Sequence, residues 1–303
     1  MQMRAGAADY VVRRAAEAEL GAALALIPEA AAAGASPEAV FVACRAQTPD
    51  VLGAAAFSTL PDDTRCTGVR GDVFVLPSAR RRGVGTALLG ALTQEAARWD
   101  VPHLHGWRAY QAGGETQFLQ RNGFEPLRSI RHFRVDIATA DTVCTAMLER
   151  WSKQGRIPGE LALAPLASTH LEEASELYAR HFGLSAAHAK NLLRLAGASD
   201  ARALSFELRH QKRLLGVIVW KCPPDELPTV DLWIASPEFR LGWPAMVLLQ
   251  KSVRRCAELG FSEAGFHCND DARATLHIAR LINATLVREE WTYTLDVARP
   301  VAP

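Results

Sequence analysis

Three consecutive arginines and two nearby glycines are the residues of this chain best suited to hold a phosphate group. They lie together in residues 80–86, Arg-Arg-Arg-Gly-Val-Gly-Thr. Arginine side chains form paired hydrogen bonds with phosphate oxygens, and glycines, which lack a Cβ atom, let an anion approach the backbone closely. The segment therefore predicts a binding site for a ligand that contains phosphate.

The residues on either side of this segment predict a strand followed by a helix. An apolar run from Val73 to Leu76 leads into the segment. From Thr86 to Trp99 the apolar residues recur at spacings of three and four, which is typical of an amphipathic helix. The first backbone N–H groups of a helix have no internal partner and lie at the positive end of its dipole. We therefore expect the phosphate to lie at the start of this helix.

Two common phosphate-binding motifs do not match the segment. The pattern G-x-x-x-x-G-K-[ST] is absent, and G-x-G-x-x-G would require a glycine at position 88, where the chain has Leu88. What remains is Arg80-x-x-Gly83-x-Gly85 directly after a strand that ends at Pro77. This arrangement resembles the pyrophosphate loop of the GCN5-related N-acetyltransferase (GNAT) superfamily. The alternative is a solvated surface turn in front of an ordinary helix.

The GNAT resemblance implies a set of residues that contact acetyl-CoA, the co-substrate of that family. The strand would hold the pantetheine and the thioester carbonyl through backbone groups, and the loop would hold the pyrophosphate. The residues implied are Phe74, Val75, Leu76, Arg80, Arg81, Arg82, Gly83, Val84, Gly85 and Thr86. The resemblance also implies direct acyl transfer to an amine, with no metal and no covalent enzyme intermediate.

The catalytic residues are less clearly marked. Residues 118–124, Phe-Leu-Gln-Arg-Asn-Gly-Phe, resemble the F-Y-x-x-x-G-F end of the fourth GNAT helix, but Leu119 replaces the tyrosine that often acts as general acid there. We take Tyr110 as the substitute acid, with His105 as a further possibility. Asp72 on the preceding strand is the best placed general base, the alternative being a solvent-facing structural residue. Transfer without a dedicated acid also remains open.

The second half of the chain repeats the first. A shift of 160 positions places Pro77 on Pro237 and Arg80 on Arg240, and the match continues through the helix and the final strand. The chain is therefore expected to be an α/β protein of two tandem GNAT modules, each a mixed central sheet flanked by helices, in an arrangement that resembles mycothiol synthase. The expected boundaries are residues 1–138, a helical linker over 139–159, and 160–303.

The two copies of the loop differ. Under the same shift Gly83 becomes Trp243 and Gly85 becomes Ala245, with Pro244 between them removing one N–H donor. We therefore expect the N-terminal module to bind the coenzyme and carry out catalysis, and the C-terminal module to keep the fold and help form the substrate cleft or the interface between the modules. A realignment by one position could instead preserve Gly242 as a loop glycine, and tandem members of the family can act from the C-terminal copy.

The composition is that of a globular chain. The 303 residues are 49% hydrophobic and 22% charged with a net charge of +1, which gives no indication of a nucleic-acid or membrane partner. The six cysteines form no C-x-x-C pair and no metal-binding spacing, which favours reduced thiols and a cytoplasmic location. The GNAT resemblance implies an acetyl-CoA-dependent N-acetyltransferase acting on a small-molecule amine. A non-catalytic acyl-CoA sensor, a different acyl donor and a hydroxyl acceptor are the alternatives. The oligomeric state stays open.

Overall fold

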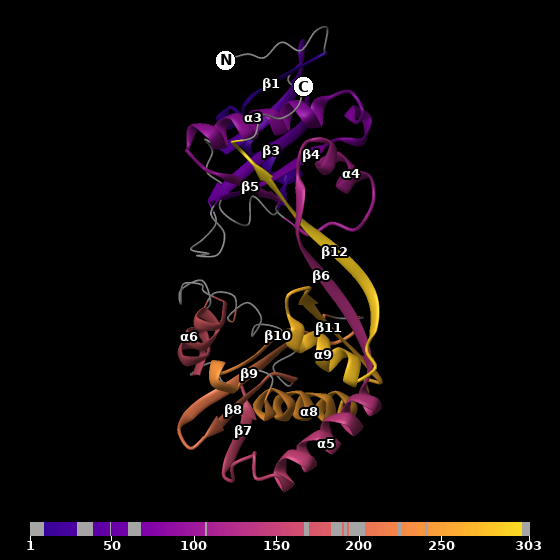
Figure 1. Cartoon of the computed structure of the whole chain (residues 1–303). Helices are drawn as coiled ribbons and strands as arrows, with labels where there is room; N and C mark the ends of the chain where they lie inside the picture. Colours follow the sequence, from indigo (N-terminus) through magenta and orange to yellow (C-terminus); the bar gives the residue numbers. More distant parts are fainter. Residues whose placement is uncertain are drawn as a thin grey trace. The chain divides into compact units, whose positions relative to one another are not determined.

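The chain forms two compact units, drawn in a computed structural model in Figure 1. The first unit takes Met1–Pro61, Arg65–Ser129 and Glu290–Pro303, and the second takes Asp62–Thr64 and Ile130–Glu289. The structure describes residues 9–28, 39–48, 50–59, 68–106, 108–166, 170–182, 190, 193, 204–223, 226–239 and 242–298.

The first unit is built on a mixed sheet. Its strands are β1 (Tyr10–Arg14), β2 (Val40–Arg45), β3 (Val51–Thr59), β4 (Val69–Val75) and β5 (His103–Gly106), together with parts of β6 (Glu125–Asp136) and β12 (Thr285–Asp296). Strands β1 to β4 pair antiparallel in chain order, β5 pairs parallel to β4, and β12 pairs antiparallel to β5. Its helices are α1 (Glu17–Leu26), α3 (Val84–Arg98), α4 (Gly114–Arg121) and the short 3-10 helix η2 (Pro77–Ala79).

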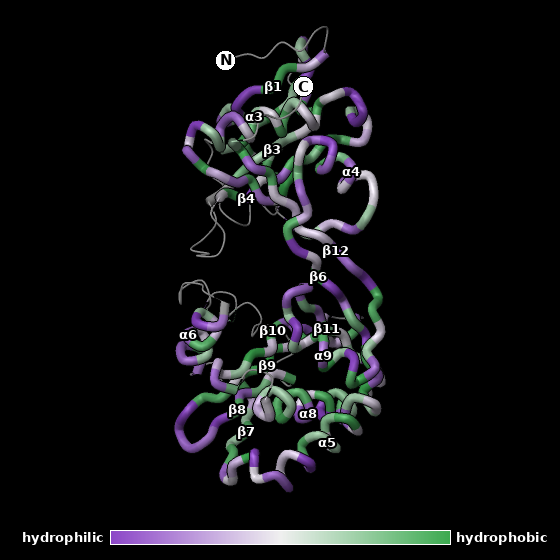
Figure 2. Tube along the Cα trace, in the orientation of Figure 1, coloured by the Kyte–Doolittle hydropathy of each residue, from purple (hydrophilic) through white to green (hydrophobic). Residues whose placement is uncertain are grey.

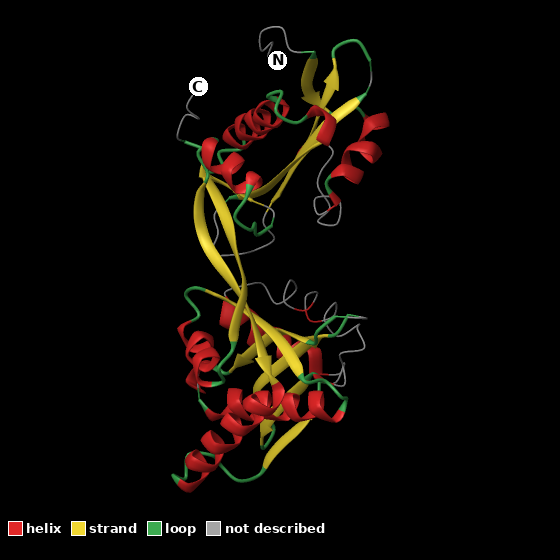
Figure 3. Ribbon diagram, turned by 90° about the vertical axis from the view of Figure 1, so that its right-hand side faces the viewer, coloured by secondary structure: helices red, strands yellow, loops and turns green. Residues whose placement is uncertain are grey.

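Helices cover both faces of this first sheet, as Figure 3 shows. The apolar stripe of α3 buries Leu88, Leu89, Leu92 and Ala96 against one face. On the other face, α1 packs Ala23 with the alternate residues of β2 and β3. Alternation along each strand thus supplies two separate apolar clusters from one sheet. The expected helix after the loop is confirmed, and it fixes the loop at one end of β4.

The second unit repeats this plan. Its further strands are β7 (Leu161–Pro165), β8 (Phe206–His210), β9 (Arg213–Lys221), β10 (Thr229–Ala235) and β11 (Glu263–Asn269). Its helices are α5 (Ile137–Lys153), α6 (Leu171–Phe182), α8 (Trp243–Glu258), α9 (Arg273–Leu281) and the 3-10 helix η5 (Pro237–Phe239). Strands β7 to β10 pair antiparallel in chain order, β11 pairs parallel to β10, and β6 pairs antiparallel to β11. The expected fold class, a mixed sheet flanked by helices, is confirmed.

Two glycines show how closely the repeat is preserved. A Cβ atom on Gly53 would lie 2.6 Å from the carbonyl oxygen of Phe74, and one on Gly216 would lie 2.7 Å from that of Ile234. Phe74 and Ile234 are 234 − 74 = 160 positions apart, which is the shift found in the sequence. The pair β3 and β4 and the pair β9 and β10 therefore approach each other equally closely at equivalent positions.

The units exchange the final strand of each half of the chain. Strand β6 continues from the first unit into the second after Ser129, and β12 returns to the first unit at Glu290. The expected boundaries at residues 138 and 160 follow the order of the repeat along the chain, whereas the compact units cross that order. Residues 290–296 of the C-terminal half thus complete the sheet of the first unit.

The expected linker helix is part of the core of the second unit. Helix α5 begins at Ile137, where the Asp136 carboxylate accepts a hydrogen bond from the N–H of Thr139 at 2.7 Å. Cys144 and Trp151 are buried in the same apolar cluster as α8. Hydrophobic residues run along both helices in Figure 2. No helix among the described residues is long and apolar enough to cross a membrane.

Candidate active site

The arginine–glycine loop joins β4 to α3, as the sequence predicts. Gly83 has a positive φ of 80° and precedes the first helical residue, Val84. The first recorded helical bond of α3 runs from the N–H of Ala87 to the carbonyl of Gly83 at 3.0 Å. The N–H groups of residues 84–86 therefore have no helical partner and point out of the helix start. This is the geometry that binds anions at helix N-termini.

The two loop glycines have different surroundings. A Cβ atom on Gly83 would lie 3.1 Å from the hydroxyl oxygen of Tyr10, and one on Gly85 would lie 3.2 Å from the Phe118 ring. Gly83 is also left-handed, a conformation that other residues rarely adopt. Gly83 therefore keeps exposed backbone open beside a hydroxyl group, whereas Gly85 also makes room for the aromatic ring of α4.

The three arginines are all exposed, and one of them supports the loop. The Arg80 Nε donates a hydrogen bond to the Val75 carbonyl at 3.0 Å, and its guanidinium carbon lies 6.0 Å from the centre of the Phe74 ring. Arg81 adopts a positive φ of 59° at the turn. Arg80 thus ties the loop to the end of β4, while Arg81 and Arg82 add positive charge at the helix start.

The pairing of β4 with β5 ends before the end of β4, and we call this point the strand divergence of the first unit. The parallel pairing of the two strands includes Val69, Arg70 and Gly71 on β4 and ends at Gly106 on β5. Residues Phe74, Val75 and Leu76 are half-buried, and β3 pairs with the first two of them on the opposite edge. Beyond Gly71, β4 therefore presents a backbone edge that β5 does not occupy, which fits an extended ligand such as pantetheine.

The two proposed catalytic residues lie at this divergence. Asp72 is 8% exposed, and its carboxylate accepts a hydrogen bond from the N–H of Val73 at 2.8 Å. Tyr110 is also 8% exposed, and it exchanges two backbone hydrogen bonds of 2.9 and 2.8 Å with Trp291 on β12. Burial, and then the nearby charge of Asp72, raise the pKa of Tyr110 to about 12. The hydroxyl group is therefore protonated at neutral pH.

A cavity of about 360 Å³ opens beside Tyr110. It is lined by Arg108, Ala109, Tyr110, Gln111, Ala112, Gly113, Gly114, Glu115 and Glu290. Arg108 and Glu115 form an ion pair of 3.1 Å, and the Arg108 guanidinium lies 5.2 Å from the centre of the Tyr110 ring. The wall is thus mostly one loop, with Glu290 added by the last strand of the chain.

The start of α8, which corresponds to the start of α3, is covered by aromatic side chains. Trp243 is 6% exposed and packs edge-on against Phe239, with ring centres 5.7 Å apart. The Trp233 indole donates a hydrogen bond of 3.0 Å to the carbonyl of Ala245. Gly242 has a φ of −90°, so it does not form the left-handed turn of Gly83. Aromatic side chains therefore occupy the start of α8, where a phosphate would need open backbone.

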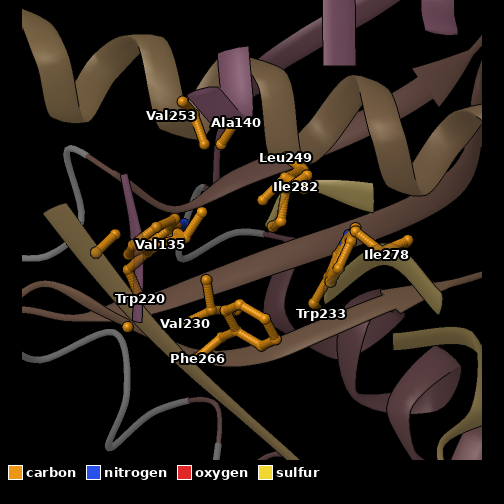
Figure 4. A pocket seen from close by; sticks show the side chains of 12 residues that line it. Val135, Ala140, Trp220, Val230, Trp233, Leu249, Val253, Phe266, Ile278 and Ile282 are labelled. Atoms are coloured by element: carbon orange, nitrogen blue, oxygen red, sulfur yellow. The ribbon is translucent and has the colours of Figure 1, made fainter. Parts of the chain in front are cut away.

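The divergence of β10 and β11 in the second unit is filled in the same way. A hollow in the adjoining apolar core has a volume of about 20 Å³ and a lining that includes Trp220, Trp233 and Phe266 (Figure 4). A space of that size holds about one water molecule. It has no room for a pantetheine arm.

Two other candidate positions, Leu119 and His105, are buried in the first unit. Leu119 stands where the family often has a tyrosine, and its side chain has no group that could donate a proton. It is buried in the apolar cluster of the first unit. His105 is buried on β5, and a Cβ atom on Gly68 would lie 2.9 Å from its ring. Among the described residues, no group of three His, Cys, Asp or Glu side chains is arranged to hold a metal ion.

Three residues of this site were missed by sequence reasoning. Tyr10, Arg108 and Glu290 belong to different strands or loops and carry no local motif. Arg108 is two positions from Tyr110 and could have been found from it. Tyr10 reaches the site because β1 brings it against the apolar cluster that contains the start of α3, and Glu290 because the end of β12 pairs with β5.

A mixed sheet with an open helix start beside a strand divergence is the arrangement that the GNAT resemblance implies. Residues 36–126 match the family model described as acetyltransferase (GNAT) domain. Almost all of this matched segment belongs to the first unit, which therefore contains a domain similar to the GNAT acetyltransferases.

Further similar proteins are found by sequence and by structure. A mycothiol acetyltransferase of Geodermatophilus obscurus is 36% identical over 98 residues, which covers 30% of this chain and 31% of that protein. The alignment thus spans about a third of the curated relative. Two solved structures share the fold over nearly the whole chain. A GCN5-related N-acetyltransferase from Sphaerobacter thermophilus has a TM-score of 0.58 at 13% identity, covering 97% of each chain. A tandem GNAT protein from the clavulanic acid biosynthesis pathway has a TM-score of 0.58 at 16% identity, covering 96% of this chain and 98% of that one.

Proposed function

We propose that the first unit transfers an acetyl group from acetyl-CoA to the amine of a small molecule. The observation that carries this proposal is the junction of β4 and α3, where Gly83 leaves the helix start open beside three exposed arginines. The GNAT domain match over residues 36–126 supports it, because that segment contains the whole junction.

The residues of this junction fit the co-substrate in two places. The N–H groups of residues 84–86 and the side chains of Arg81 and Arg82 are suited to the pyrophosphate. The open backbone edge of Phe74, Val75 and Leu76 is suited to the amides of pantetheine, since an extended ligand can pair with an unoccupied strand edge. Bound there, acetyl-CoA supplies an activated thioester next to Asp72.

In this proposal Asp72 takes up a proton and Tyr110 acts as a hydrogen-bond donor. Asp72 accepts the proton of the attacking amine, directly or through a water molecule. Tyr110, with a pKa of about 12, is a much weaker acid than a thiol, whose pKa is about 8.5. Tyr110 therefore donates a hydrogen bond toward the sulfur position, and it does not need to give up its proton.

The second unit has no coenzyme site in this proposal. Its loop and its strand divergence are filled by Trp243, Trp233 and Phe266. The C-terminal half of the chain contributes instead through residues 290–296, which pair with β5 and with Tyr110.

Isothermal titration calorimetry with acetyl-CoA, followed by an amine-acetylation assay, tests the proposal. We expect one binding site per chain and transfer to at least one class of small amine. The absence of binding at high micromolar coenzyme would overturn the proposal. Binding without turnover over a broad panel of amines and acyl donors would favour an acyl-CoA sensor.

A further inference from the structure

The proposed reaction assigns no role to Arg108, the cationic side chain that lies against Tyr110. The guanidinium carbon of Arg108 is 5.2 Å from the centre of the Tyr110 ring, and both residues line the same cavity. A cation is attracted to the face of an aromatic ring, and the contact holds the two side chains together. Arg108 therefore helps to fix the ring that carries the proposed hydrogen-bond donor.

The charge of Arg108 also acts on the Tyr110 hydroxyl group. Burial and then the charge of Asp72 raise the pKa of that hydroxyl, whereas the charge of Arg108 acts in the opposite direction. A positive charge lowers the pKa of a phenol because it stabilises the anionic form. It would stabilise another anion formed beside the hydroxyl group for the same reason.

The proposed reaction forms such an anion. The amine nitrogen bonds to the acetyl carbon, the carbon–sulfur bond breaks, and its electron pair stays on sulfur as a thiolate. The amine proton goes to Asp72, and Tyr110 keeps its own proton. The charge on sulfur therefore persists until the thiolate takes a proton from solvent, and a cation close to the sulfur lowers the energy of this state.

The other charged residues near Tyr110 form a constant background. Glu115 pairs with Arg108 at 3.1 Å, but the two side chains are 66% and 46% exposed, so water screens the pair and Glu115 offsets the charge of Arg108 only in part. Asp72 on β4 and Glu290 on β12 remain in place when Arg108 is changed. A substitution of Arg108 therefore isolates the contribution of one cation.

The second half of the chain lacks both residues of this pair. A shift of 160 positions places Arg108 on Cys268 and Tyr110 on Asp270. The unit in which aromatic side chains cover the helix start thus has neither the arginine nor the tyrosine at these positions. This is expected if the two residues serve one reaction.

Building on the proposed function, we propose that Arg108 is a positioning residue for Tyr110 and that its positive charge stabilises the departing thiolate of coenzyme A. The sulfur of acetyl-CoA is uncharged, so Arg108 acts on the transition state and the product and has little effect on the binding of acetyl-CoA.

The test measures the pKa of the thiol group of bound coenzyme A in the wild type and in Arg108→Gln. The thiolate absorbs ultraviolet light, and the same protein with desulfo-coenzyme A, which lacks the sulfur, supplies the baseline for each variant. We expect this pKa to be about one unit higher in Arg108→Gln, a tenfold loss of thiolate stabilisation. Arg108→Lys, which keeps the charge, should restore most of the difference.

Two variants serve as matched controls. Glu115→Gln breaks the same ion pair but keeps Arg108, so the pKa of the bound thiol should not rise. Arg121→Gln removes an exposed positive charge in the last turn of α4, outside the cavity lining, and should leave this pKa unchanged. A rise in Glu115→Gln equal to that in Arg108→Gln would overturn the inference, because the geometry of the loop and not the charge would then control the thiol.

Calorimetry and kinetics separate this inference from the proposed function. Acetyl-CoA should bind the wild type and Arg108→Gln with dissociation constants within about twofold, while kcat falls about tenfold in the variant, the pattern of an interaction made only in the transition state. An unchanged thiol pKa in Arg108→Gln would overturn the inference and leave the acetyltransferase proposal intact. If the wild type binds neither coenzyme A nor acetyl-CoA, the proposed function fails and the inference fails with it.

Discussion

The two units have the same framework, but among the described residues the helix start of the first unit is open and that of the second is covered by aromatic side chains. At the strand divergence, the second unit has Trp233 and Phe266, and a shift of 160 positions places Val73 and Gly106 at the equivalent points of the first. A Cβ atom on Gly106 would lie 3.3 Å from the Tyr110 ring, so the small residue makes room for the proposed catalytic side chain.

The difference between the units shows that one fold accommodates either an open or a filled helix start. Aromatic side chains that close the second site also enlarge its apolar core, and burial of such groups is favourable. In the first unit a cavity of about 360 Å³ beside Tyr110 is lined by charged residues, among them Arg108 and Glu115. Side chains near the strand divergence thus serve packing in the second unit, and we expect them to serve binding in the first. Substitutions at equivalent positions of the two units test this expectation.

The largest difference is expected from copying the second loop into the first. Gly83→Trp should abolish measurable acetyl-CoA binding, because the new ring would cover the start of α3 and collide with Tyr10. The left-handed conformation of Gly83 adds strain for any side chain. Calorimetry with acetyl-CoA measures the effect, and circular dichroism verifies that the variant is folded.

Trp243→Phe is the matched control in the second unit. Trp243 is buried, so its removal to glycine would leave a core cavity, whereas phenylalanine retains most of the packing. Coenzyme affinity should change by less than about twofold, as expected for distant and independent sites. A large loss of affinity in this variant, with normal binding by Gly83→Trp, would move the coenzyme site to the second unit.

The next largest effect is expected at the proposed general base. Asp72→Asn should lower kcat by about a hundredfold, the usual contribution of a positioned base, while the dissociation constant of acetyl-CoA stays close to that of the wild type. Steady-state kinetics with a responsive amine gives the first quantity and calorimetry the second. Asp231→Asn, at an ion pair with Lys221 in the second unit, should leave kcat unchanged. A normal kcat in Asp72→Asn would return Asp72 to a structural role.

Local sequence patterns predicted the parts of the site that are continuous in the chain. The strand, the loop and α3 follow directly from the apolar run, the glycines and the helical spacing, and the 160-residue repeat predicted the second sheet. The strand exchange was not predictable in this way, because β6 and β12 have equivalent sequence patterns. Each could equally have paired within the sheet formed by its own half of the chain. Glu290 therefore has no signal in the sequence that places it beside Tyr110.

Tyr10 offers a smaller effect at the phosphate end of the site. Its hydroxyl group stands beside Gly83 and makes no hydrogen bond among the described residues, while the strand equivalent in the second unit, β7, begins with Leu161. Tyr10→Phe should weaken acetyl-CoA binding by about fivefold, the value of one hydrogen bond. The same variant should bind acetyl-pantetheine, which lacks the diphosphate, as the wild type does. Equal losses for both ligands would place the effect outside the phosphate site.

The smallest expected effect concerns a pair of glutamates at equivalent positions of the two units. Glu19 is the third residue of α1, where Arg13 donates two hydrogen bonds of 2.6 and 2.7 Å to it, and Glu173 is the third residue of α6, where Arg209 donates one of 2.6 Å. The Arg13 hydrogen bonds, and then the N–H of Ala16, lower the pKa of Glu19 to about 2.

A lowered pKa means that folding favours the ionised form of Glu19. Its contribution to stability is therefore complete above pH 4.5 and is lost as the pH falls toward 2. Glu19→Gln should destabilise α1 by about 1 kcal/mol at neutral pH, and wild type and variant should converge near pH 2. Native-state hydrogen exchange of the α1 amides isolates this effect from the unfolding of the second unit. Glu17→Gln, at an exposed position of the same turn, is the control. A Glu19→Gln difference that persists unchanged to low pH would show that packing, and not the ion pair with Arg13, anchors α1 to the first sheet.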